Sequence, residues 1–424
     1  MHCGAAGGAG ERLDASVPVV VLKLHHGSLG IARSLGRLGV AVYGLNATAG
    51  TPGWHSRYWR GRFQWDVENA PAQRSVEYLL ALGRRLGTTA LLVPVSDRIA
   101  MFVAEHAQAL GERFRFPAVA RATVEGLISK REMYFLARKF GIPTAQTEFP
   151  QSRGEVIDFI DRGRFPVVLK GIDGARLKAR SGCTLAIARS AAELLEQYDR
   201  MEDPAGPNLM LQEYIPGGED SVWMFNGYFN ADSECLAGFT GKKIRQNPVY
   251  TGSTSLGVCL RNDQVAGLTR TFMKAVGYRG ILDIGYRYDA RDGEYKVLDV
   301  NPRIGASFRL FVDRSGLDVV RAFYRDMTGQ AVPAAVAIEG RKWVVENHDI
   351  ESTYKYWLDG KLGFLQWLGS FRGVREGAWF AWDDLRPFCL MSRDFLAGAA
   401  RSRARKLVLP LGRSASSWWN RISP

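Results

Sequence analysis

The chain has 424 residues, which is long enough for two to four domains, and its 46% hydrophobic and 23% charged residues are typical of a globular protein. Five cysteines without a Cys-x-x-Cys pair and six scattered histidines exclude the common zinc-binding patterns and predict unpaired thiols in a reducing compartment. The formal net charge is +13, but residues 393–424 carry seven Lys or Arg against one Asp, so this tail supplies +6 of it. The rest of the chain is mildly basic, as suits a protein that handles anionic ligands.

Residues 1–16 are rich in Gly and Ala and lack the apolar core of a signal peptide, so we expect a disordered tail there. No stretch of the sequence approaches the roughly 18 apolar residues that cross a membrane. We therefore expect a cytoplasmic protein.

Residues 17–118 predict a Rossmann-like α/β lobe. A β-branched run at residues 17–24 is typical of a buried parallel strand, and a glycine turn, an amphipathic helix and a second strand follow it. The turn is too short for a dinucleotide fingerprint, so it is either an anion site at a helix N-terminus or a purely structural turn. Farther on, Ser96 and Asp97 follow a strand at residues 90–95, where such sheets hold ligands; capping the next helix is the alternative role.

Residues 119–332 predict a second unit that mixes helices with strands. Its first helix, at residues 124–140, carries Lys130 in its first turns, and a buried strand ends in Lys170. An ammonium group that closes an apolar strand is costly to bury without an anionic partner. The following loop, residues 171–182, is rich in glycine and basic residues, which indicates a flexible cover for phosphates or an ordinary basic hairpin loop.

A hairpin near the end of this unit combines acidic, amide and basic side chains. Strands at residues 281–288 and 295–300 are joined by a polar turn that closes with Asp-Gly. Asp299 and Asn301 are two residues apart, so their side chains share one face of the sheet, and Arg303 follows within reach of it. These groups suit a divalent cation bound to phosphates; the alternative is a strand-ending Asn-Pro turn.

In their order along the chain, these features resemble the ATP-grasp superfamily of carboxylate–amine ligases. The resemblance covers about residues 17–330, and the segments EYIPGGED, FTGKKIRQ and LDVNPRIGAS are most similar to its D-aspartate ligase-like group. It implies an α/β protein with a Rossmann-like pre-domain, an α+β nucleotide-binding part of two subdomains that clasp ATP, and a Trp-rich C-terminal extension. The expected boundaries are a tail at 1–16, the pre-domain at 17–118, the ATP-grasp domain at 119–332, the aromatic extension at 333–392 and a basic tail at 393–424.

The resemblance also implies the ligands and the role of each site residue. ATP and Mg²⁺ (or Mn²⁺) would be the cofactors, and a small carboxylate and an amine would be joined through an acyl phosphate. Arg303, with Lys243 or Arg245, would stabilise the charge that develops on the transferred phosphoryl group. The nucleotide would contact Lys130, Lys170, Gln212, Glu213, Tyr214 and Ile215, with Glu219 or Asp220 at the ribose, and the metal would be held by Asp283, Asp299 and Asn301.

One position departs from the family pattern. Where the family has an acidic metal ligand on the first hairpin strand, this chain has Gly285, and we expect Asp283, two residues earlier on the same face, to replace it. The alternatives are that Asp283 is structural and water completes the metal site, or that the site binds nucleotide and turns over poorly. Two functions therefore remain: a ligase, and an ATP-binding regulatory or scaffold protein with little or no ligase activity.

The C-terminal region differs in composition from the rest. Seven of the eleven tryptophans lie beyond residue 340, followed by the basic tail. Interfacial aromatics with positive charge are typical of peripheral membrane contact, whereas the alternative is an aromatic subdomain that packs on the core and a solvated tail. Nucleic acid is not an expected partner, because the charge is confined to one terminal run. The sequence does not predict an oligomeric state.

Overall fold

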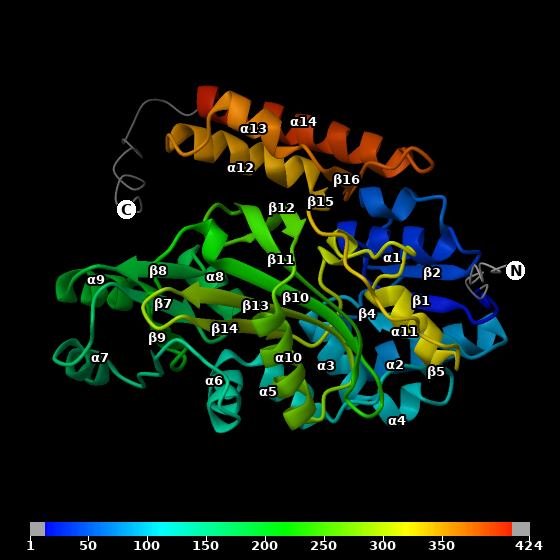
Figure 1. Ribbon diagram of the computed structural model, residues 1–424, viewed down its shortest axis with the longest axis horizontal. Helices are drawn as coiled ribbons and strands as arrows, with labels where there is room; N and C mark the ends of the chain where they lie inside the picture. The colour runs from blue at the N-terminus through cyan, green and yellow to red at the C-terminus, as the bar shows by residue number, and fades with distance from the viewer. Residues whose placement is uncertain (1–12, 409–424) are drawn as a thin grey trace, which may run out of the picture.

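The computed structural model describes residues 13–408, with side chains described up to residue 401. The N-terminal lobe is a five-stranded, all-parallel sheet in the order β3-β2-β1-β4-β5 (Figure 1). Its strands are β1 (Val19–Leu22), β2 (Val42–Asn46), β3 (Trp59–Gln64), β4 (Ala90–Pro94) and β5 (Phe114–Arg115), and its helices are α1 (His26–Gly36), α2 (Ala72–Leu86), α3 (Asp97–Glu105) and α4 (Ala107–Leu110). All four residues of β1 are fully buried, because helices cover both faces of the sheet. The predicted Rossmann-like lobe is confirmed.

Two helices, α5 (Arg121–Ile128) and α6 (Lys130–Lys139), lead from this lobe into the next unit. The prediction of one helix over residues 124–140 is wrong, because the chain leaves helical geometry at Ser129. The Ser129 hydroxyl accepts a hydrogen bond from the Glu132 amide at 3.3 Å and so caps α6. The break makes Lys130 the first residue of a new helix.

A small antiparallel sheet in the order β6-β9-β7-β8 follows. It consists of β6 (Thr147–Glu148), β7 (Val167–Gly171), β8 (Leu185–Ala188) and β9 (Leu209–Glu213), with α7 (Arg153–Ile160), α8 (Gly174–Ser181) and α9 (Ala191–Met201). The basic segment that we expected to be a flexible cover or a hairpin loop is helix α8. Asp173 caps it by accepting from the amides of Ala175 and Arg176, and Gly182 ends it at a φ of 76°.

A large seven-stranded sheet carries the hairpin, in the order β14-β13-β10-β11-β12-β15-β16. Its strands are β10 (Val222–Phe229), β11 (Cys235–Asn247), β12 (Ser253–Cys259), β13 (Gly280–Asp289), β14 (Glu294–Asn301), β15 (Lys342–Val344) and β16 (Val374–Gly377), with α10 (Asp263–Val276) and α11 (Val319–Met327). The predicted hairpin is confirmed as β13 and β14. Leu282, Ile284 and Tyr286 of β13 pack in the core with α10, so the alternate residues Asp283 and Gly285 belong to the opposite face.

The C-terminal region forms a helical layer of α12 (Glu346–Leu358), α13 (Phe364–Ser370) and α14 (Arg386–Val408), at the top of Figure 1. Because β15 and β16 belong to the large sheet, the boundary expected at residue 333 separates strands of one sheet, and α14 runs through the boundary expected at residue 393. One apolar cluster joins the pre-domain, the large sheet and this region, with Trp343 and Trp379 among its members.

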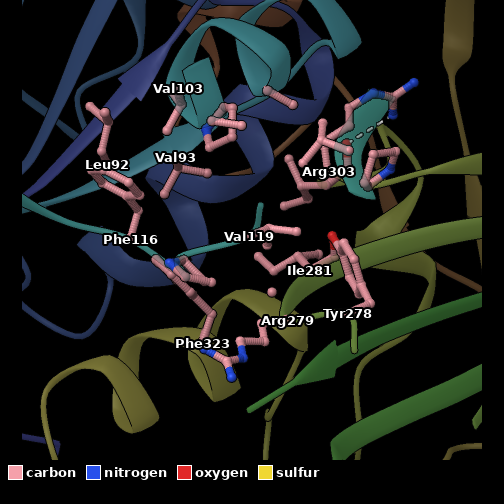
Figure 2. Close-up of a pocket in the computed structure, with 18 of the residues that line it drawn as sticks. Leu92, Val93, Val103, Phe116, Val119, Tyr278, Arg279, Ile281, Arg303 and Phe323 are labelled. Carbon is pink, nitrogen blue, oxygen red and sulfur yellow. Dashed lines mark hydrogen bonds between the residues drawn. The ribbon is translucent and has the colours of Figure 1, made fainter. Parts of the chain in front are cut away.

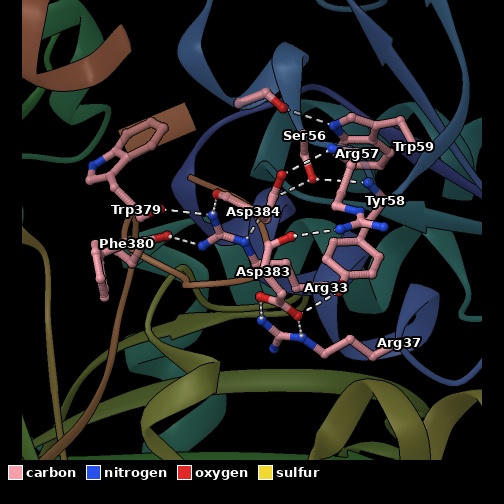
Figure 3. A network of polar contacts seen from close by, with 12 residues as sticks. Arg33, Arg37, Ser56, Arg57, Tyr58, Trp59, Trp379, Phe380, Asp383 and Asp384 are labelled. Atoms are coloured by element: carbon pink, nitrogen blue, oxygen red, sulfur yellow. Dashed lines mark hydrogen bonds and ion pairs between the residues drawn. The ribbon is translucent and has the colours of Figure 1, made fainter. Parts of the chain in front are cut away.

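Two buried arginines fasten the C-terminal region to the rest of the protein. Arg33 of α1 donates to the Asp384 carboxylate at 3.0 Å and to the carbonyl oxygens of Ala378, Trp379 and Asp384 (Figure 3). Arg309 donates to both carboxylate oxygens of Glu376, at 2.8 and 2.7 Å. Within the described part of the chain, no helix is both long and apolar enough to span a membrane.

Candidate functional site

The hairpin brings the three predicted metal ligands to one face of the large sheet. Asp283 lies opposite Asn301, and Gly285 lies opposite Asp299. The Asn301 amide nitrogen is 3.1 Å from an Asp299 carboxylate oxygen and 3.4 Å from one of Asp283. Among the described residues no group of three His, Cys, Asp or Glu could hold a metal, so this site offers two carboxylates and an amide. Such a set of hard oxygen ligands fits Mg²⁺ only if other oxygens, such as those of phosphates, complete the coordination.

Asp283 is the more enclosed of the two carboxylates. Asn226 of β10 donates to it at 2.7 Å, and a Cβ on Gly305 would lie only 2.6 Å from its carboxyl carbon. Burial raises the pKa of Asp283, and the nearby Asp299 raises it further, against the opposing charges of Arg303 and Lys243. The buried Asn226 side-chain oxygen has no hydrogen-bond partner in the structure. A cation beside Asp283 would therefore offset the cost of burying its negative charge next to Asp299, and the Asn226 side-chain oxygen could act as a further ligand.

Lys130, at the start of α6, and Lys170, on β7 of the small sheet, converge on this face. The Lys170 ammonium donates to the Gln212 side-chain oxygen at 2.8 Å, and Lys130 donates to the Gly171 carbonyl at 3.0 Å. Burial lowers the pKa of Lys170 to about 8, with Asp299 acting to raise it and Lys130 to lower it further. Burial likewise lowers the pKa of Lys130, against the attraction of Asp299. Two partly desolvated ammonium groups beside one exposed carboxylate make this region electropositive, as an anion site requires.

The predicted adenine segment lies at the end of β9. Gln212 is buried, with its amide nitrogen 3.1 Å from the Thr147 hydroxyl. The Glu213 carboxylate accepts hydrogen bonds from the Arg291 guanidinium at 2.5 Å and from the backbone amide of Gln146 at 3.1 Å. The carboxylate therefore ties the small sheet to the turn of the hairpin.

The backbone after Glu213 is held by the hairpin as well. Arg287 of β13 donates to the carbonyl oxygens of Ile215 and Gly217, at 2.9 and 2.5 Å. Ile215 is buried, whereas Tyr214 is partly exposed beside it. The segment that would bind adenine through its backbone is thus fixed by a residue that the sequence analysis did not single out.

The two acids proposed for the ribose differ in their surroundings. Glu219 is partly buried and accepts a hydrogen bond from the Tyr356 hydroxyl of α12, whereas Asp220 is exposed. Burial raises the pKa of Glu219 to about 7, although the Tyr250 backbone amide and the charges of Arg245 and Lys243 act in the other direction. Asp220 is the acid that is open to a ligand in this structure.

The three predicted catalytic cations do not lie together. Arg303 stays at the metal face, where it donates to Asn301 at 3.1 Å and to Asp97 at 2.8 Å. Lys243 lies close enough to lower the pKa of Asp283 and donates to the Gly252 carbonyl. Arg245, by contrast, is buried against α12, with two 2.8 Å hydrogen bonds to the Asp349 carboxylate. An irregularity in the β11–β12 pairing between Lys243 and Arg245 breaks the alternation that would have put both on one face.

The carboxyl edge of the pre-domain sheet adds polar groups next to Arg303. Lys23 and Glu68 form a 2.6 Å ion pair, and the Ser96 hydroxyl donates to the same carboxylate at 2.6 Å. Ser96 also caps α3, while Asp97 forms the ion pair with Arg303. Lys23 has a φ of 79°, a strained geometry for a residue with a side chain. Strand-end position indicated Ser96 and Asp97 in the sequence, whereas nothing there pointed to Lys23 or Glu68.

Behind Arg303 lies a small apolar cavity of about 60 Å³ between the pre-domain and the large sheet (Figure 2). Figure 2 shows Val93, Phe116, Ile281 and Phe323 around it, with Arg303 at one side. A volume of that size holds only a few water molecules, so this cavity is too small for a nucleotide. It is an imperfection in the packing of two units, next to the functional site.

No protein-family model matches the chain. A D-aspartate ligase from Enterococcus faecium is 25% identical over 252 residues, which are 56% of this chain and 58% of that protein. The chain spans less than two thirds of the length of the curated relatives it matches.

Two solved structures share the fold over most of the chain. The ADP complex of N5-carboxyaminoimidazole synthetase from Staphylococcus aureus has a TM-score of 0.60 at 12% identity, covering 78% of this chain and 82% of its own. The biotin carboxylase domain of Hydrogenobacter thermophilus 2-oxoglutarate carboxylase, in complex with MgADP, has a TM-score of 0.57 at 16% identity, covering 76% and 72%. These comparisons confirm the fold class predicted from the sequence.

Proposed function

We propose that this chain, which has the ATP-grasp fold, is an ATP-dependent ligase that joins a carboxylate to an amine through an acyl phosphate. Mg-ATP would lie between the small sheet and the β13–β14 hairpin. The observation that carries the proposal is the convergence of Lys130, Lys170, Asp299, Asn301 and Arg303 from three separate elements on one cleft. The similarity in sequence to a D-aspartate ligase supports the same chemistry.

In this proposal the phosphates are bound by Lys130 and Lys170, whose lowered pKa values would rise again once an anion is present. Asp299 and Asn301 would hold the metal, with Asp283 beneath them. The bound Mg²⁺ supplies charge neutralisation and orientation for the γ-phosphate. Arg303 and Lys243 supply the remaining positive charge on the substrate side of the cleft.

The reaction requires positioning and not a protein nucleophile. A carboxylate oxygen of the substrate attacks the γ-phosphorus, and the bond to the bridging β-phosphate oxygen breaks, which gives an acyl phosphate and ADP. The amine then attacks the acyl carbon. The bond between that carbon and the bridging oxygen breaks, phosphate leaves with its electron pair, and the nitrogen loses a proton. Arg303 would orient the first substrate, because Asp97 and Asn301 fix its guanidinium from two sides.

The nucleotide base would be bound mainly by backbone. Ion pairing of the Glu213 carboxylate leaves Gln212, Tyr214 and Ile215 for the adenine edge. Asp220 is the better candidate for the ribose hydroxyls, because Tyr356 already occupies Glu219.

The second candidate function is an ATP-binding regulatory or scaffold protein. It is favoured by Gly285, which leaves only two carboxylates at the metal face, and by the enclosed position of Asp283. A ligase would need Asp283, or water, to complete the coordination.

The two functions are separated by measuring ADP release from Mg-ATP with a panel of amino acids, small carboxylates and amines. A ligase forms ADP only when a carboxylate substrate is supplied, and its steady turnover rises when the matching amine is added. The Asp299→Ala variant should show neither effect. Tight ATP binding without substrate-dependent ADP release would refute the ligase and support the regulatory protein. Contact with a membrane, predicted from the C-terminal residues, is a separate proposal that rests on a different surface.

A further inference from the structure

The outer face of the C-terminal layer is apolar. Ile350, Tyr354, Trp357 and Leu358 of α12 and Phe364, Leu365 and Leu368 of α13 are 52% to 80% exposed, and we call these seven residues the apolar ridge. The α12 members are spaced as i, i+4, i+7 and i+8, which is one face of a helix. The α13 members continue from them across a short turn.

A surface helix usually buries its apolar side chains and exposes its polar ones, and α12 departs from this pattern. The inner face of α12 carries the buried Asp349 and Ser352, and Asp349 holds Arg245 in place. Tyr356 is also buried on this inner face, whereas the four α12 members of the ridge are on the other face, in water. Contiguous exposed apolar surface of this kind marks an interaction site. Its exposure to water is unfavourable, and no contact within the described part of the chain relieves that cost.

The exposed fractions indicate what kind of partner fits. Leu365 is 80% exposed and Phe364 is 68% exposed, so these side chains project from the surface and do not line a groove. Exposed basic residues lie near the ridge in the chain, at Lys361 and Arg372, as do the exposed acids Glu351 and Asp359. The sequence from residue 393 to 424 contains seven Lys or Arg against one Asp, so the net charge of the C-terminal region is positive. Projecting aliphatic and aromatic side chains flanked by positive charge match a bilayer surface with anionic headgroups.

We propose that the apolar ridge inserts into the interface of a membrane that contains anionic lipid, with the neighbouring basic residues on the headgroups. The layer would lie on the membrane and not cross it, in keeping with the lack of a membrane-spanning helix among residues 13–408. This attachment is independent of the ligase activity, because the ridge residues are distinct from those of the cleft. Figure 1 shows the layer on one side of the molecule, where it can meet a flat surface.

The test is flotation of the full chain with vesicles of phosphatidylcholine alone or mixed with phosphatidylglycerol. The wild type is expected to float with the mixed vesicles. The double variant Phe364→Ser/Leu365→Ser should partition at least about tenfold less, because two projecting apolar side chains are lost. Phe135→Ser/Ile157→Ser, which removes exposed apolar side chains from α6 and α7, is the matched control and should float like the wild type.

A charge variant, Lys361→Glu/Arg372→Glu, should lose the preference for the mixed vesicles. The proposal is overturned if the wild type floats with neither vesicle, if it does not discriminate between them, or if the ridge variant and the control float equally. It is also overturned if sedimentation shows a wild-type dimer that Phe364→Ser/Leu365→Ser dissociates, since the ridge would then join two copies of the chain. Unchanged thermal melting of each variant establishes that its fold is intact.

Discussion

The partly or fully buried cations in two regions of this protein have different kinds of partner. In the cleft, Lys130 and Lys170 donate to neutral oxygens of Gly171 and Gln212. At the C-terminal layer, Arg33, Arg245 and Arg309 each face a carboxylate directly.

This difference in partners distinguishes the cations that can bind a ligand from those that stabilise the fold. Burial lowers the pKa of Lys170 to about 8, so the cleft retains an uncompensated cost that an anion can relieve. At Arg309 burial also acts to lower the pKa, but Glu376 and Asp318 outweigh it and raise the pKa above its ordinary value. Among these five cations, the three that pair with a carboxylate anchor the fold, whereas the two that donate only to neutral oxygens are available to a ligand. Four substitutions test this distinction.

The largest effect is expected at Asp299. The Asp299→Asn variant should form ADP at least about 100-fold more slowly, because the cleft loses its exposed carboxylate for the metal. Its melting temperature should stay near that of the wild type, since the side chain is solvated. Steady-state kinetics and a thermal melt measure the two. Full activity in this variant would remove Asp299 from the metal site.

Breaking an anchor should lower stability instead. Arg245→Met leaves the Asp349 carboxylate, 2% exposed, without its partner, and the free energy of unfolding should fall by about 3–5 kcal/mol. The double variant Arg245→Met/Asp349→Leu should recover most of that loss. Urea unfolding measures both, and ATP binding by the folded fraction should be unchanged. A stable Arg245→Met protein that binds ATP but cannot turn it over would return Arg245 to the catalytic residues.

Lys170 should show an intermediate effect with a defined pH dependence. Lys170→Met should weaken ATP binding by about 10- to 100-fold, because a charge-assisted contact to phosphate is lost. In the wild type, the lysine is protonated below its lowered pKa of about 8, so ATP affinity should fall as the pH rises through 8, with proton uptake on binding above that pH. Without ATP, stability should rise between pH 8 and the ordinary pKa of 10.5, because only the unfolded chain still holds the proton there.

Calorimetry in buffers of different ionisation enthalpy measures the proton uptake. Lys178→Met removes an exposed lysine of α8 and serves as the control. A pH dependence of ATP binding that survives in Lys170→Met would assign it to another group.

The smallest effect is expected at Gly285. A Cβ there would have the Asp299 carboxylate oxygen as its nearest neighbour, at 3.2 Å, so a larger side chain could be added beside the metal face. Gly285→Glu should lower the Mn²⁺ concentration for half-maximal activity by about threefold to tenfold, and Gly285→Gln should not. Equal metal dependence in both variants would mean that Asp283 already completes the coordination.

The sequence alone determined the fold class, the order of the units and the hairpin. Periodicity is a local property, so the alternation in β13 and the two-residue spacing of Asp299 and Asn301 predict their shared face. The convergence of Lys130 and Lys170 on that face came from the family resemblance, and the electrostatic coupling of both lysines to Asp299 agrees with it.

Only the tertiary structure decides which residue each charged side chain pairs with, because the two partners are far apart in the sequence. Arg245 has the same basic sequence context as Lys243, but a break in strand pairing turns it toward Asp349, 104 residues later. The Glu213 carboxylate accepts a hydrogen bond from Arg291, which is 78 residues away in the sequence. Lys23 and Glu68 meet across 45 residues and carried no sequence signal at all. The sequence supplied the charges; the fold decided which of them are neutralised within the chain and which remain for a ligand.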